Sequence, residues 1–268
     1  MRKWDVLDIV SFELTVCGVS WLLLLLGLLA PQMFLHFTAH LSLGFITAFV
    51  TAASIMPGVG LAVFLKDARV PILRFKAGIH VYVIAILLGL ILPFSAQFGC
   101  SEGGRLWNSA IPGTIVRVFL LNIWLSPLWE EIAWRGYFYP KIAPLMPTSA
   151  AMVVGSLGWM IWHLGFLSFL YKSGLPPRAL IFLPVQYFCI GIILSSVFVI
   201  GRGSLLPCVC LHAAFNAAVA AYFGTNDRAW NIGCYFAETV AVLVVSIVLF
   251  FMANKRAFPL TAPKGQTT

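Results

Sequence analysis

Charged side chains are scarce in this sequence, and acidic ones are the scarcest. Of 268 residues, 10% are charged, with nine Asp and Glu against 17 Lys and Arg, while 61% are hydrophobic. A water-soluble domain of this length does not bury so much apolar surface, so the composition indicates a membrane protein with several helical spans. The long apolar runs, such as 81–94 and 240–252, also lack the alternating polarity of a transmembrane β-barrel.

Cysteine motifs are missing as well. The six cysteines are spread through apolar stretches, and no two of them form a C-x-x-C pair. Cys208 and Cys210 do not have the spacing of a zinc site. We therefore expect the cysteines to be small free side chains buried between helices.

The net charge of +8 does not indicate a nucleic-acid partner. The basic residues are scattered between apolar runs, which is the pattern of loop charges that orient membrane spans. With the N-terminus inside, twelve Lys and Arg fall in inner segments and five in outer segments. This asymmetry predicts an integral membrane protein in contact with the lipid bilayer, with both termini in the cytoplasm.

Apolar windows of about twenty residues predict an all-α, polytopic membrane protein of about eight transmembrane helices with an intramembrane polar cavity. The windows are 10–33, 41–65, 78–98, 114–139, 149–171, 179–200, 204–223 and 232–253. The first follows Arg2 and Lys3 and is interpreted as an uncleaved span, because it is long for a signal peptide. Without a linker or repeat, residues 1–268 are predicted to be one domain, with N-terminal spans within 10–98, a motif-bearing core at about 114–220 and a last span at 232–253.

Two adjacent acids, Glu130 and Glu131, lie inside the fourth apolar window, whereas nearly every other acid can be placed at the water interface. Carboxylates inside a span are costly and mark a functional site by default. Helical spacing pairs Glu131 with Arg135, four residues on, and turns Glu130 about 100° away. Glu130 is thereby left free to act as a general base, and Pro127 is expected to kink the helix one turn earlier. The structural alternative is a buried ion pair that only fixes helix packing.

Three polar residues on later spans complete the candidate site. His163 lies in the fifth window, and His212 and Asn216 share one helical face in the seventh. Each alone would more often be an interhelical hydrogen bond than a catalytic group. At about 1.5 Å per residue, however, the glutamates and both histidines lie roughly 12–20 Å from the inner ends of their spans. We therefore expect them to meet in one polar cavity.

These motifs together resemble a known family. The order Glu130-Glu131-x-x-x-Arg135, aromatic-x-x-x-His163 and His212-x-x-x-Asn216 on separate spans resembles the CAAX protease and bacteriocin-processing (CPBP, or Abi) family of intramembrane glutamic proteases. The resemblance covers about residues 114–220. The segment Gly136-Tyr137-Phe138 fits the prokaryotic branch, which implies a prokaryotic inner or plasma membrane.

The resemblance implies an intramembrane endopeptidase without cofactor or metal, acting on a membrane-anchored or lipidated peptide or protein. Glu130 with His163 would activate a water molecule, His212 and Asn216 would stabilise the oxyanion, and Arg135 would hold Glu131. The imidazole N–H of His212 and the amide N–H₂ of Asn216 are hydrogen-bond donors, which suits them to stabilise a developing negative charge. Trp159 is a supporting residue. It departs from the family pattern, because the family usually carries Phe at this position. We expect this departure to alter the shape of the pocket rather than the chemistry.

Several alternatives remain open on the sequence alone. Two histidines and a glutamate are zinc ligands in metalloproteases, but no H-E-x-x-H motif occurs. Serine and paired-aspartate intramembrane proteases are disfavoured, because no Gly-x-Ser-Gly and no Asp pair occurs within a span. Outside the proteases, the alternatives are a non-catalytic membrane scaffold or immunity-type protein, and a transporter that uses Glu130 as its proton carrier.

Overall fold

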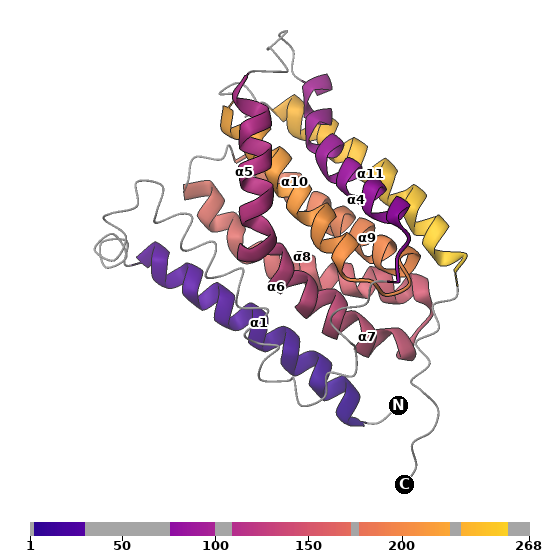
Figure 1. Cartoon of the computed structure of the whole chain (residues 1–268). Helices are drawn as coiled ribbons and strands as arrows, with labels where there is room; N and C mark the ends of the chain where they lie inside the picture. Colours follow the sequence, from indigo (N-terminus) through magenta and orange to yellow (C-terminus); the bar gives the residue numbers. More distant parts are fainter. Residues whose placement is uncertain (1–2, 30–75, 100–108, 173–176, 226–231, 257–268) are drawn as a thin grey trace.

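The structure, a computed structural model, describes residues 3–29, 76–99, 109–172, 177–225 and 232–256. Every element in these residues is helical (Figure 1). The α-helices are α1 (Lys3–Leu29), α4 (Ile79–Phe94), α5 (Ala110–Leu125), α6 (Pro127–Glu131), α7 (Tyr139–Ile142), α8 (Thr148–Lys172), α9 (Leu183–Ile200), α10 (Leu206–Thr225) and α11 (Ile232–Asn254). Shorter elements are the 3₁₀-helices η2 (Ser95–Gly99), η4 (Ala143–Leu145) and η5 (Ala179–Ile181), and the π-helix η3 (Ile132–Phe138).

The prediction of an all-α, polytopic membrane protein is confirmed. Five helical segments within the described residues are long and apolar enough to cross a membrane: Val6–Leu25, Ile79–Gly99, Thr148–Leu167, Ala179–Ile200 and Ile232–Asn254. A bent pair, Ile111–Leu125 with Pro127–Leu145, makes a sixth crossing if it counts as one span, and Leu206–Tyr222 is a shorter apolar helix. The predicted window 41–65 lies outside the described residues.

The predicted fourth span is broken rather than merely kinked. Its two parts, α5 and the segment from α6 onward, meet at an angle of 45°. Pro127 lacks an N–H and disfavours the helical conformation of the residue before it, and Ser126 accordingly has φ −141° and ψ −64°. Beyond the break, α6 runs into the wider π-helix, a form that is often found at functional sites.

The helices pack around α10, which contacts α4, α5, α6 and α9, while α8 packs against α9 and α1 lies along the outer side of α8 (Figure 1). The main core is rich in aromatic side chains, with Trp134, Trp159 and Trp162 almost fully buried. On the outer faces of α5 and α11, by contrast, large apolar side chains such as Trp124 and Phe251 are exposed. Apolar side chains on the outward faces of helices are what a lipid environment requires.

Two expectations from the sequence were wrong. Glu13 and Glu238 lie inside the apolar segments of α1 and α11 rather than at the water interface, and Glu238 is only 3% exposed. Each of these acids stands alone in its apolar segment, so the sequence did not indicate that its side chain faces another helix. The cysteine prediction holds for Cys17, Cys189 and Cys208, which are free and buried. Cys210 is free but only partly buried, and Cys234 is disulfide-bonded.

Candidate functional site

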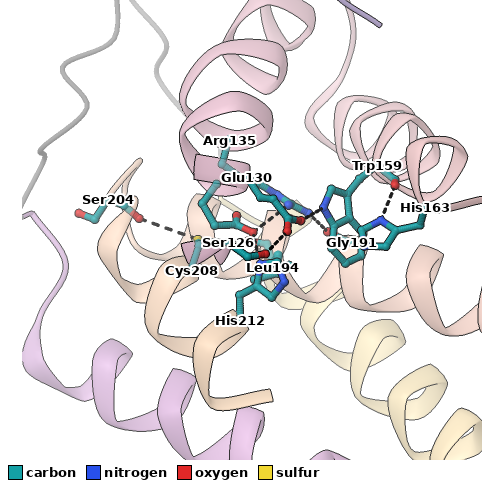
Figure 2. A network of polar contacts seen from close by, with 11 residues as sticks. Ser126, Glu130, Arg135, Trp159, His163, Gly191, Leu194, Ser204, Cys208 and His212 are labelled. Carbon is teal, nitrogen blue, oxygen red and sulfur yellow. Dashed lines mark hydrogen bonds and ion pairs between the residues drawn. The ribbon is translucent and has the colours of Figure 1, made fainter. Parts of the chain in front are cut away.

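The two adjacent glutamates are both buried at the C-terminal end of the short helix α6. Glu130 is 2% exposed, and Glu131 is fully buried. Arg135, in the π-helix, places Nη1 3.2 Å from Oε1 of Glu131, so the predicted ion pair is formed. Its Nη2 donates to the backbone oxygen of Gly191 on α9 at 3.1 Å (Figure 2). The guanidinium therefore links the π-helix to α9 as well as neutralising Glu131.

Glu131 also contacts α10. Nδ1 of His212 lies 2.9 Å from the same Oε1 that pairs with Arg135. An ionised carboxylate only accepts hydrogen bonds, so Nδ1 of His212 carries the hydrogen. In the neutral ring, Nε2 then presents a lone pair, and it becomes a donor only in the imidazolium form.

Glu130 has a different set of partners. The hydroxyl of Ser126 donates to Oε1 at 2.5 Å, and the indole Nε1 of Trp159 donates to Oε2 at 3.2 Å (Figure 2). Both donors are neutral, whereas the hydrogen-bond partners of Glu131 include the cation Arg135. The two carboxylates therefore differ as the sequence predicted: one is held by charge and the other is oriented by neutral hydrogen bonds.

Trp159 connects most of the site. Its backbone oxygen lies 2.8 Å from Nδ1 of His163, and its ring is 4.0 Å from the ring of His163 and 5.7 Å from that of His212, between centroids. The guanidinium carbon of Arg135 lies 5.4 Å from the centre of the same indole. Because a carbonyl accepts only, Nδ1 of His163 is protonated and Nε2 is left with its lone pair. His163 thus presents a basic nitrogen from a half-buried ring.

The structure brings six of the seven predicted residues into one network of direct contacts: Glu130, Glu131, Arg135, Trp159, His163 and His212. Glu130 and His163 are joined through Trp159, which bonds to both. Asn216 lies on α10 one turn after His212 and is half-buried. It therefore shares the helical face of His212.

Sequence reasoning missed Ser126 and Gly191. Ser126 precedes Glu130 by four residues, so the same helical spacing that paired Glu131 with Arg135 could have found it. Gly191 contributes a backbone oxygen from another helix, for which a sequence carries no signal. Among the described residues, no three His, Cys, Asp or Glu side chains are arranged to hold a metal ion.

A buried network of two carboxylates, two imidazoles and a guanidinium within apolar helices defines a class: a polytopic membrane protein with an intramembrane polar site. Residues 112–218 match a family model described as "Rce1-like: Type II CAAX prenyl endopeptidase Rce1-like". This segment contains the whole network, and its similarity to the CAAX protease family indicates a peptidase. No curated protein matches the chain.

Proposed function

We propose that the protein is an intramembrane glutamic endopeptidase that hydrolyses a peptide bond in a lipidated or otherwise membrane-tethered peptide. The observation that carries this proposal is that the two glutamates have different hydrogen-bond partners. Glu131 is hydrogen-bonded to Arg135 and His212, whereas Glu130 is oriented by the neutral hydrogen-bond donors Ser126 and Trp159. A carboxylate held in this way is suited to accept a proton from water.

In the first step, Glu130 accepts a proton from a water molecule as the water oxygen forms a bond to the peptide carbonyl carbon. His163 accepts a hydrogen bond from the same water at Nε2, the nitrogen that its contact with Trp159 leaves unprotonated. Two acceptors on one water fix its orientation toward the carbonyl, which lowers the entropic cost of attack.

The carbonyl oxygen becomes negatively charged as the tetrahedral intermediate forms. His212 in its imidazolium form donates from Nε2, while Glu131 holds Nδ1, and Asn216 donates from its amide one turn along α10. Donors fixed in advance by other contacts stabilise an oxyanion without reorganising during the reaction. Glu130 then returns its proton to the amide nitrogen as the C–N bond breaks, which yields a carboxylic acid and an amine.

A membrane-tethered substrate is favoured because the site lies within apolar helices rather than in a soluble domain. The description of the matching family, a prenyl endopeptidase, supports a lipidated cysteine as the anchor. We infer in addition that both termini face the cytoplasm and that the membrane is a prokaryotic inner or plasma membrane. The disulfide at Cys234 supports the orientation, because this residue lies at the end of α11 opposite Lys255 and Arg256, and disulfides persist on the oxidising side.

The proposal is tested with purified protein in liposomes and a quenched fluorescent peptide that ends in a prenylated cysteine followed by three residues. A second probe carries a palmitoyl chain in place of the prenyl group, and products are identified by mass spectrometry. Glu130→Gln keeps the size of the side chain but removes the base, so we expect a loss of about 10²–10⁴-fold in kcat.

Glu13→Gln is the matched control, because Glu13 also lies within an apolar span but contacts Cys17 rather than the polar site. This variant should cleave within about twofold of the wild-type rate, since surface and remote polar substitutions act mainly on stability. Equal activity of Glu130→Gln and wild type would contradict the assignment of the base. Failure of the wild-type protein to cleave both lipidated peptides would contradict the proposed substrate class.

A further inference from the structure

His163 is surrounded by aromatic rings, and one of them comes from a different helix. Trp159, Trp162 and Phe166 lie on α8 with His163, at centroid distances of 4.0, 4.6 and 5.8 Å from the imidazole. Tyr187, on α9, lies 4.3 Å from the imidazole with an angle of 30° between the ring planes. The α8 rings move with His163, so Tyr187 is the contact that fixes the imidazole relative to α9.

The position of Tyr187 is itself fixed by its neighbour in sequence. Nε2 of Gln186 donates to Oγ1 of Thr239 at 2.9 Å and to the backbone oxygen of Tyr235 at 3.3 Å, both on α11. The same nitrogen lies 3.5 Å from Oε2 of Glu238. Gln186 is buried, so these bonds are shielded from water and hold this part of α9 against α11.

Tyr187 also lies where the two apolar cores of the bundle meet. Its ring packs against the main core around Trp159 and against the smaller core that contains Leu183, Tyr222 and Tyr235. Its ring stands at 90° to the indole of Trp159, with 6.2 Å between centroids. Tyr187 therefore contacts both His163 and Trp159. The indole of Trp159 donates to Glu130, and its backbone oxygen accepts from His163.

We propose that Tyr187 is a positioning residue for His163, which holds the imidazole against Trp159 so that Nε2 stays in the orientation needed to accept from the attacking water. This inference rests on the proposed function. It adds a second α9 residue to a site that already includes Gly191, and through Gln186 it extends the site to α11, which lies outside the matched segment 112–218. The contact is between rings, so the ring of Tyr187 is the part that acts, and Phe substitutes for it.

The test compares Tyr187→Phe, which keeps the ring, with Tyr187→Leu, which removes it, on the prenylated probe in liposomes. A misplaced reacting group costs about 10–100-fold in rate, so Tyr187→Leu should lower kcat by that factor with KM changed less than about twofold. Tyr187→Phe should keep at least half of the wild-type kcat. Phe188→Leu, the next residue on the same helix, is the matched control for loss of an aromatic ring from α9 and should stay within about twofold.

A double-mutant cycle separates positioning from general loss of packing. If Tyr187 acts through His163, then Tyr187→Leu should lower kcat in the wild-type background but not further in His163→Ala. An equal loss in both backgrounds, an equal loss in Phe188→Leu, or wild-type kcat in Tyr187→Leu would each overturn the proposal. These results are distinguishable from failure of the proposed function, which would appear as full activity of Glu130→Gln in the same assay.

Discussion

Buried carboxylates occur in two regions of the helical bundle, and their partners differ. On α6, Glu131 is shared by the guanidinium of Arg135 and the imidazole of His212. On α11, the buried Glu238 has the neutral amide of Gln186 at 3.5 Å. Burial of an acid inside a membrane span is therefore common to both regions. What distinguishes the candidate active site is the arrangement of a cation and two imidazoles around its carboxylates, which costs free energy unless every charge is matched.

The largest expected effect is on the buried ion pair. Arg135→Met keeps an extended apolar side chain but leaves Glu131 without its guanidinium and the Gly191 oxygen without its donor. Breaking a buried pair on one side typically costs about 3–5 kcal/mol. We expect a loss of this size in the free energy of unfolding, measured by titration with denaturing detergent in micelles.

The control is an ion pair of similar length near the surface. Nζ of Lys141 lies 3.3 Å from Oδ2 of Asp8, with side chains 19% and 36% exposed. Surface pairs contribute about 0–1 kcal/mol, so Lys141→Met should destabilise the protein by no more than that. Equal losses of unfolding free energy in the two variants would show that the buried Arg135–Glu131 pair contributes no more to stability than the surface pair.

The next effect concerns the indole that orients Glu130. Trp159→Phe keeps an aromatic ring but removes the N–H that donates to Oε2. Hydrogen bonds to charged groups contribute about 1.5–3 kcal/mol, so we expect kcat on the prenylated probe to fall roughly tenfold or more. Phe is the residue that the resembled family usually carries here, and activity should accordingly be reduced rather than lost.

Trp162→Phe is the matched control for Trp159→Phe. The Trp162 indole donates to Oγ of Ser20 on α1 at 2.8 Å, away from Glu130. This variant loses the same chemical group from the same helix, but we expect its kcat to stay within about twofold of the wild-type value. A similar fall in both variants would mean that the indole N–H groups stabilise the fold rather than orient the base.

Contacts within one helix were predictable from the sequence. The convergence of three spans was also predicted, but the individual contacts between the helices were not. The spacing of Glu131 and Arg135 gave their ion pair, and Pro127 marked the break in the span. The bond from His212 to Glu131 joins residues 81 positions apart, and no periodicity shows how α10 is rotated against α6. The apolar windows predicted the spans, but the choice between a plain kink, a 45° break and a π-helix depends on packing.

The smallest effect is expected at the second buried carboxylate. Glu238→Gln keeps an oxygen that accepts from Nε2 of Gln186, so the contact between α9 and α11 is preserved. We expect the free energy of unfolding to change by no more than about 1 kcal/mol and kcat to stay within about twofold, measured beside Glu130→Gln on the same probe. The same chemical change thus separates the two regions: it removes the proposed general base on α6 and only an ionisable group on α11. A loss of activity in Glu238→Gln as large as that in Glu130→Gln would instead make the α11 carboxylate a participant in the reaction.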